Sequence, residues 1–223
     1  MTSASLMRSI WTFDSIQEAY PMKSSLFSFL LCLLLAAGSA SAGPAAGKPA
    51  PAADGPVILR NPAGETVAPL AARGQKATVL FFLTSECSIG NSYAPEIARI
   101  VQDYQKAGVV CYAIYAHEAA EEVARHTREF KLPLTGLLDP GLILARRTGA
   151  TVTPEVCVLS PPGEVLYRGR IDDRAVRIGK VRPEPRVRDL RLALDAVLQG
   201  KPVPVKYTKA IGCYIDFPEA RGK

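Results

Sequence analysis

The sequence predicts an α/β fold, in which helices cover both faces of a β-sheet. Two continuous apolar runs, "ATVLFFL" and "VVCYAIYA", have the length and composition of strands buried on both sides of a sheet. Amphipathic segments with apolar residues at three- and four-residue spacing alternate with these runs. A hydrophobic content of 48% with 22% charged residues suits a globular domain with a sizeable core.

The expected elements follow one another in a simple order. Two short strands flank a turn at residues 61–64 and precede the first buried strand. The helix after that strand begins near residues 90–91, would be kinked by Pro95 and ends at Gly108. The remaining expected elements are a strand at 109–116, helices at 119–130 and 140–149, a hairpin with strands at 155–160 and 164–170, and a last helix at 186–200.

The first 42 residues have the composition of a secretory signal peptide. Lys23 gives a short basic region, residues 26–37 form an apolar run, and residues 40–42 offer a cleavage site after Ala42. The alternative is a membrane-spanning anchor, but the run is shorter than the roughly 20 apolar residues that a spanning helix needs. We therefore expect an exported protein of the periplasm or cell envelope, with Met22 as an alternative start.

Three regions divide the rest of the chain. Residues 43–56 form a Pro/Ala/Gly-rich linker, and residues 57–199 form the globular domain. Residues 200–223 form a C-terminal extension that carries Cys213.

Positive charge is concentrated between Arg168 and Arg191. This segment holds eight arginines, one lysine and four acidic residues, so it carries +5 of the net charge of +6. A solvated loop is the usual explanation of such a run, and a docking face for an acidic partner is the alternative. No nucleic-acid-binding motif accompanies the segment, so no nucleic-acid partner is expected.

Cys87 lies between the end of a buried strand and the start of a helix, where α/β proteins gather their chemistry. The N–H groups and dipole of a helix N-terminus stabilise a thiolate there, whereas neighbouring Glu86 acts against it. Export would place Cys87, Cys111, Cys157 and Cys213 in a compartment where disulfides persist. Four cysteines are too few for a disulfide scaffold, which favours redox chemistry or a single bridge.

Several features of the sequence occur together around this cysteine. They are "FFLTSEC" ending at Cys87, Ala94-Pro95 with its proline eight residues later, Thr153-Pro154 before the next strand, the run "LLDPGLILARRTGATVTPE" and the late "GC". Over about residues 55–198 the chain resembles the thioredoxin fold, in its AhpC/TSA redoxin and TlpA-like branch. The resemblance implies a central mixed β-sheet flanked by helices, with short N-terminal strands and a C-terminal tail.

The same resemblance implies roles for individual residues. Cys87 corresponds to the nucleophilic cysteine, and Thr153 and Pro154 to the substrate-facing loop, in which the proline could be cis. The chain departs from the family at Gly90, which replaces the second cysteine of a C-x-x-C motif. Dithiol exchange within one helical turn is therefore not available.

A resolving thiol would then come from another part of the chain. Cys213 is the best candidate, because flexible Gly212 precedes it in a tail that could fold back over the sheet; the alternative is a free thiol near a mobile terminus. Cys111 and Cys157 lie in strands among apolar neighbours, as inert core cysteines do. Cys87 could itself be structural, in a domain that kept the fold and lost the chemistry.

A peroxidase site is a further interpretation. The peroxiredoxin motif resembles P-x-x-x-T/S-x-x-C, and Thr84 matches it three residues before Cys87. The proline position holds Leu80, however. Arg168 and Arg170 could replace the arginine that peroxiredoxins place near the thiol, but no sequence pattern requires either of them in that role. One of the three features matches.

We therefore expect an exported thioredoxin-fold redoxin that acts in thiol-disulfide chemistry, with Cys87 and Cys213 as catalytic residues and Thr84, Thr153 and Pro154 at the substrate. A peroxiredoxin-like peroxidase and a redox-inactive binding module are the alternatives. The expected partners are a thiol or disulfide protein, or a peroxide, with an electron-donor protein to reset the cycle. No cofactor is required, and the two histidines do not make a metal-ligand spacing with Cys87.

Overall fold

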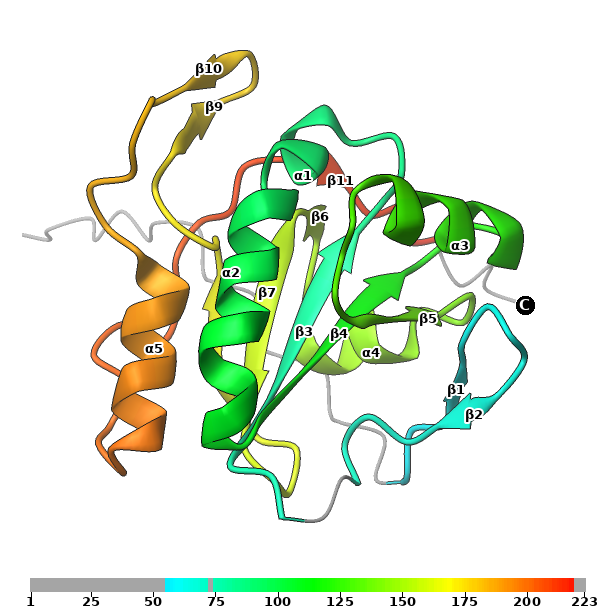
Figure 1. Cartoon of the computed structure of the whole chain (residues 1–223), viewed down its shortest axis with the longest axis horizontal. Coiled ribbons are helices and arrows are strands. Elements are labelled where there is room, and N and C mark those ends of the chain that lie inside the picture. Colours follow the sequence, from blue (N-terminus) through cyan, green and yellow to red (C-terminus); the bar gives the residue numbers. More distant parts are fainter. Residues whose placement is uncertain (1–54, 72–73, 219–223) are drawn as a thin grey trace, which may run out of the picture. The chain divides into compact units, whose positions relative to one another are not determined.

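A seven-stranded mixed sheet forms the centre of the computed structural model, which describes residues 55–71 and 74–218 (Figure 1). In chain order its strands are β1 (Leu59–Arg60), β2 (Thr66–Val67), β3 (Ala77–Leu83), β4 (Val109–Tyr115), β5 (Thr135–Leu138), β7 (Glu155–Leu159) and β8 (Val165–Gly169). Their order across the sheet is β2-β1-β5-β4-β3-β7-β8.

The first apolar run forms β3, at the centre of the sheet. All seven of its residues are buried, and it pairs in parallel with β4 and antiparallel with β7. This confirms the strand expected from the run, because only a strand covered on both faces is apolar at every position.

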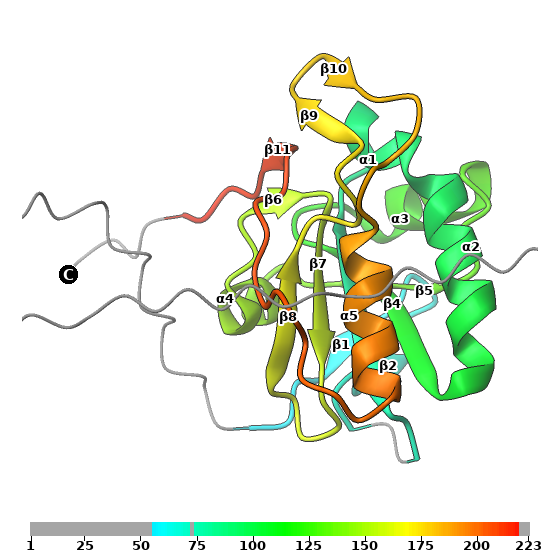
Figure 2. The ribbon, with the colours of Figure 1, turned by 90° about the vertical axis from the view of Figure 1, so that its left-hand side faces the viewer.

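The described residues form five α-helices, four of which cover the two faces of the sheet. They are α1 (Ser88–Ser92), α2 (Ala94–Tyr104), α3 (Ala120–Glu129), α4 (Ile143–Thr148) and α5 (Asp189–Leu198). Buried residues of α2, α3 and α5 pack in one core cluster, and those of α4 pack in a second. Figure 2 shows α2 and α5 on one side of the sheet and α4 on the other. The expected sheet with helices on both faces is thus confirmed.

The helix after β3 differs from the expectation. It begins at Ser88 rather than near residues 90–91, and it is divided into two helices at Tyr93. Pro95 lies in the first turn of α2, where the absent N–H of a proline costs nothing. The expected kink is therefore a new helix start. The segment ends in a short 3₁₀ turn, Gln105–Ala107, capped by Gly108 with φ 92°.

Four short strands that the sequence did not predict lie outside the main sheet. β6 (Val152–Thr153) pairs antiparallel with β11 (Cys213–Tyr214), and β9 (Ala175–Arg177) pairs antiparallel with β10 (Lys180–Val181). Figures 1 and 2 show α1, β11 and the β9–β10 hairpin at the same end of the sheet.

The residues after α5 run back along the edge of the sheet. Arg168 of β8 donates its N–H to Lys206 O and accepts from Thr208 N–H, at 2.9 and 3.1 Å. Gly169 lets the two segments approach, because a Cβ there would lie 2.2 Å from Thr208 Oγ1. The extension then continues to β11, as a tail folded back over the sheet.

The expected signal peptide and most of the linker lie outside the described residues. Among the residues that the structure describes, no helix is long and apolar enough to span a membrane.

Candidate active site

Cys87 is the N-cap residue of α1 and follows the carboxyl end of β3 after a turn of three residues. Its Sγ accepts a hydrogen bond from Gly90 N–H at 3.4 Å and donates one to the carbonyl oxygen of Thr153 at 3.0 Å. The Cys87 residue is completely buried. The helix N-terminus predicted for this cysteine is confirmed, and the opposite wall of its site is the loop before β7.

The C-terminal extension brings Cys213 to this site. The Sγ atoms of Cys213 and Cys87 lie 3.2 Å apart, and both cysteines are free thiols in the structure. The contact follows from the pairing of β11 with β6, which places Cys213 opposite Thr153 and Tyr214 opposite Val152. Two cysteines separated by 126 positions therefore lie within reach of each other.

The loop at Thr153 and Pro154 is in direct contact with both cysteine-bearing segments. The peptide bond between these two residues is cis. A Cβ at Gly212 would lie 1.9 Å from Thr153 O, so β11 approaches this loop more closely than any other residue type would permit. Close packing, and not chain flexibility, is thus the reason for glycine at this position.

The two thiols have different surroundings. Cys213 is exposed, whereas Cys87 is buried beneath it. The hydrogen bond that Cys213 donates to Cys87, together with partial burial, raises the pKa of the Cys213 thiol to about 11. At neutral pH the Cys213 sulfur therefore retains its proton and donates it toward Cys87.

Two sets of contacts hold the tail on either side of Cys213. Before it, the Thr208 hydroxyl contacts the Tyr167 hydroxyl at 2.6 Å and accepts from Arg170 N–H at 3.1 Å. After it, Ile215 N–H donates to Thr151 O at 2.9 Å, and His117 Nε2 contacts the carbonyl oxygen of Asp216 at 2.9 Å. His117 therefore fixes the tail and does not contact a thiol.

A buried histidine supports the segment that carries Cys87. His126 Nδ1 contacts the Tyr115 hydroxyl at 2.7 Å, and His126 Nε2 contacts Asn91 Oδ1 at 2.8 Å. The Asn91 amide in turn donates to Ser85 O at 2.9 Å. Because Asn91 Oδ1 can only accept, Nε2 of the neutral ring carries the proton and Nδ1 accepts from Tyr115. Burial lowers the pKa of His126, which favours this neutral form.

The other predicted residues contact the site weakly or not at all. Thr84 contributes its main-chain carbonyl, which accepts from Cys87 N–H at 3.3 Å. Cys111 and Cys157 are buried in β4 and β7, and burial raises the pKa of each to about 12, as expected of core cysteines. Arg168 donates to Gly149 O at 2.6 Å.

Most arginines of the basic segment have intramolecular acceptors. Arg170 pairs with Asp189 at 2.7 Å, Arg191 pairs with Glu96 at 2.9 Å, and Arg182 pairs with Asp173. Much of the charge in this segment therefore holds the β8–α5 region together.

The sequence did not identify the residues that support the thiols. Asn91 and His126 are 35 positions apart, so no local pattern joins them. The one available signal is the position of two polar side chains. The strand and helix patterns place Tyr115 and His126 on the buried side of β4 and α3, where a polar group needs a hydrogen-bond partner.

Comparison with known proteins agrees with this architecture. Residues 46–168, more than half of the chain, match the AhpC/TSA family. No curated protein matches the chain.

Among solved structures, the chain is similar to an uncharacterised conserved protein from Geobacillus kaustophilus, with 28% identity and a TM-score of 0.64 over 74% of this chain and 90% of that one. It is also similar to a hypothetical protein from Sinorhizobium meliloti, with 24% identity and a TM-score of 0.63 over 74% and 93% of the two chains. A thioredoxin candidate from Neisseria meningitidis shares the fold, with 20% identity and a TM-score of 0.51 over 65% and 89%. Together with the family match, this fold shows that the chain belongs to the AhpC/TSA family of thioredoxin-fold redoxins.

Proposed function

We propose that this chain is a thiol-disulfide oxidoreductase whose redox couple is Cys87 and Cys213. The observation that carries the proposal is the 3.2 Å separation of their Sγ atoms. A disulfide has an S–S length of about 2.05 Å, so a movement of little more than 1 Å converts the contact into a bond. Cys213 thereby takes the role of the cysteine that Gly90 replaces in the C-x-x-C pattern.

The exchange proceeds in two steps, written here toward reduction of a partner. Cys87 loses its thiol proton to solvent, its thiolate attacks one sulfur of the partner's disulfide, and the other sulfur leaves as a thiolate. Cys213 then loses its proton to the departing thiolate and attacks Cys87 Sγ, which expels the partner's first sulfur. Two electrons have passed to the partner, and the chain holds a Cys87–Cys213 disulfide.

Burial of Cys87 sets a condition on the first step. Because β11 covers the sulfur, the tail must leave β6 before a partner disulfide can reach Cys87. Its return brings Cys213 back for the second step. An electron-donor protein with two thiols then reduces the disulfide and is itself oxidised.

The site gives less support to a peroxidase. Leu80 is buried in the centre of β3, where the peroxidase motif has its proline. Arg168 and Arg170 point their guanidinium groups to Gly149 O and Asp189, rather than to the thiol. Thr84 remains the single match to that motif.

Disulfide mapping by mass spectrometry tests the proposal. Wild type is compared with Cys87→Ser and Cys213→Ser, each fully reduced and after one equivalent of 4,4′-dithiodipyridine, a neutral disulfide. We expect a Cys87–Cys213 link in wild type and a stable mixed disulfide in Cys213→Ser, with Cys111 and Cys157 unmodified. Free Cys87 in every state would instead support the redox-inactive binding module, and sulfenic acid formation faster with hydrogen peroxide than with any disulfide would support the peroxidase.

We also propose that the chain is exported with cleavage after Ala42. The support is the sequence of residues 22–42 alone. The mass and N-terminal sequence of the protein from the periplasm of a bacterial host test it: a start at Gly43 is expected, and an intact N-terminus in the cytoplasm would contradict it.

A further inference from the structure

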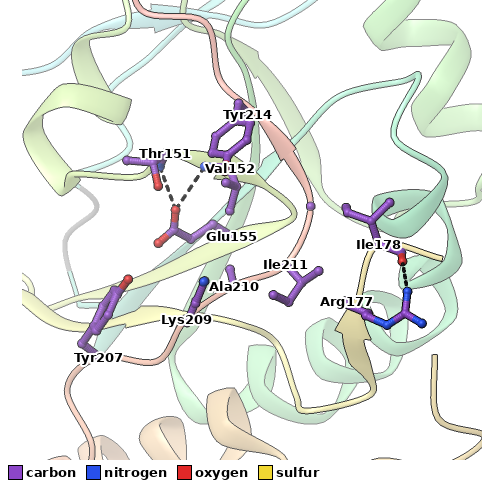
Figure 3. Close-up of a pocket in the computed structure, with 11 residues that line it drawn as sticks. Thr151, Val152, Glu155, Arg177, Ile178, Tyr207, Lys209, Ala210, Ile211 and Tyr214 are labelled. Carbon is purple, nitrogen blue, oxygen red and sulfur yellow. Dashed lines mark hydrogen bonds between the residues drawn. The ribbon is translucent and has the colours of Figure 1, made fainter. Parts of the chain in front are cut away.

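A cavity of about 320 Å³ lies between the C-terminal extension and the body of the protein (Figure 3). One wall is formed by Thr151, Val152 and Glu155, and a second by Arg177 and Ile178 at the end of β9. The third wall belongs to the tail and consists of Tyr207, Lys209, Ala210, Ile211, Gly212 and Tyr214. Both neighbours of Cys213 in the chain, Gly212 and Tyr214, line it. Neither cysteine lines the cavity itself, so the cavity lies next to Cys213 through these two chain neighbours.

This cavity depends on the position of the tail. Its third wall exists only while β11 is paired with β6, and a Cys87–Cys213 disulfide would hold β11 there covalently. The cavity is formed here while both thiols are free, and the disulfide would keep it formed in the oxidised state of the proposed cycle. A partner that recognises it would bind the form of the protein that has to be reduced.

The charges around the cavity are unbalanced. Its one acidic group, Glu155, is buried, accepts from Thr151 N–H at 2.7 Å and lies 3.5 Å from Arg168. Two cations have no acidic partner in the described part of the chain: Lys209, and Arg177, which contacts only Ile178 O at 3.5 Å. An occupant with carboxylate groups would complement them.

The remaining lining suits a polypeptide. Tyr207 and Tyr214 are exposed, as is Ile178, and Ile211 is half-buried. Figure 3 shows Ile211 between Lys209 on one side and Arg177 and Ile178 on the other. Tyrosine and arginine are enriched in protein–protein interfaces, so Tyr207, Tyr214 and Arg177 suit a polypeptide partner.

We propose that this cavity is the docking site of the electron-donor protein, and that it takes an acidic segment next to the donor's reactive cysteine. The inference rests on the redox couple proposed above. The donor's thiolate attacks Cys213 Sγ, the exposed sulfur of the disulfide, and Cys87 leaves as a thiolate. The donor's second thiol then attacks the mixed disulfide and releases Cys213, so that two electrons have passed from the donor to the chain.

The test measures how fast dithiol peptides reduce the oxidised full-length protein. Two synthetic peptides carry the same pair of cysteines, flanked by three glutamates in one and by three glutamines in the other. We expect the glutamate peptide to react about tenfold faster at low salt, and the ratio of the two rates to approach one at 0.5 M NaCl. In the double variant Arg177→Gln/Lys209→Gln the ratio should fall to about two or less.

Lys106→Gln is the matched control, because it removes an exposed cation from the 3₁₀ turn after α2, outside the cavity. It should keep the tenfold ratio. Equal rates for the two peptides in wild type, or the same loss of preference in Lys106→Gln as in the double variant, would overturn the docking site. Dithiothreitol separates the two proposals: if the oxidant-treated protein contains no Cys87–Cys213 bond for dithiothreitol to reduce, the proposed redox couple itself is wrong.

Discussion

Gly212 and Gly90 both lie beside the two thiols, but a side chain at each would meet different surroundings. A Cβ at Gly212 would overlap the main chain of Thr153, with 1.9 Å to its oxygen and 2.6 Å to its carbon. A Cβ at Gly90 would make ordinary contacts, none closer than the 3.5 Å to Cys87 Cβ. Backbone atoms of a paired strand cannot yield as a flexible side chain can.

Gly212→Ala should therefore prevent β11 from docking, whereas Gly90→Ala should be tolerated. We expect Gly212→Ala to slow formation of the Cys87–Cys213 disulfide at least tenfold, with little change in global stability because the tail lies outside the main sheet. Gly90→Ala provides the control. The measurement is the rate of intramolecular disulfide formation after a stoichiometric pulse of dithiodipyridine, and equal rates in both variants would contradict this account of the tail.

The raised pKa of Cys213 makes a second prediction at this scale. Its thiol is exposed but protonated at neutral pH, because the contact with Cys87 and partial burial raise the pKa to about 11. Alkylation of Cys213 by iodoacetamide in the reduced protein should thus be slow at pH 8 and rise toward pH 11. Cys87→Ala removes the hydrogen bond that is the largest cause of the raised pKa. The midpoint of the alkylation rate against pH should therefore shift toward the ordinary cysteine value near 9. Mass spectrometry of the peptide that contains Cys213 measures both profiles, and identical profiles would contradict the proposed contact.

Residues that belong to short sequence motifs could be predicted, whereas residues defined by contacts distant in the sequence could not. Cys87, Thr153 and Pro154 could be identified because each belongs to a short motif next to a strand. Cys213 was found only by elimination among the cysteines and by its place in a tail. The requirement for glycine at 212 could not be predicted, since it arises from a backbone 59 positions earlier in the chain.

At the scale of elements, α1 is a five-residue helix that cannot be stable by itself. Cys87 caps its N-terminus, and Asn91 near its C-terminal end accepts a hydrogen bond from His126 Nε2 and donates one to Ser85 O. His126 belongs to α3 and reaches Tyr115 of β4 with its other ring nitrogen. The redox segment is thus held by α3 directly and by β4 through His126.

His126→Ala should destabilise the protein by about 2–3 kcal/mol, because it leaves Asn91 Oδ1 and the buried Tyr115 hydroxyl without their hydrogen-bond partner. Burial lowers the pKa of His126, so the unfolded chain takes up a proton more readily than the folded one. The free energy of unfolding of wild type should therefore fall as the pH drops below about 6.5. His126→Ala should remove that part of the pH dependence.

Urea unfolding between pH 5 and 8 measures both effects. His117→Ala is the control, since His117 is exposed and contacts only the tail and its neighbour. It should change the free energy of unfolding by no more than about 0.5 kcal/mol. A loss of similar size in both variants would show that His126 is not a distinct support of α1.

The elements divide by length into those that could be predicted and those that could not. β3 and β4 are largely apolar strands of seven residues, β7 has four apolar residues in succession, and α2 and α5 span about three turns, so period and composition suffice for them. β6 and β11 have two residues each, which is too short for any period. The pairing of these two strands brings Cys213 to Cys87, and it can be recognised only in the three-dimensional structure.

For the whole molecule, the tail converts a one-cysteine motif into a two-cysteine site. The contacts at Thr208 and those at Ile215 and Asp216 fix it on both sides of Cys213, on different parts of the sheet. Charge pairing also differs between two regions of the described structure. Arginines near α5 pair with acidic groups, whereas Arg177 and Lys209 remain unpaired beside the cavity, among the residues described.

A bond between Cys87 and Cys213 would close a loop that spans 126 positions of the chain. In the chain-entropy account, closing a loop of about 100 residues restricts the unfolded chain by about 4.7 kcal/mol, and measured gains are commonly 2–4 kcal/mol. We therefore expect the oxidised protein to unfold at a urea concentration about 0.7–4 M above that of the reduced protein, given slopes of about 1–3 kcal/mol/M. Cys213→Ser should show no such difference between oxidising and reducing buffers. A midpoint that is independent of oxidation in wild type would mean that the two sulfurs do not bond, and a shift that persists in Cys213→Ser would assign the bond to another pair of cysteines.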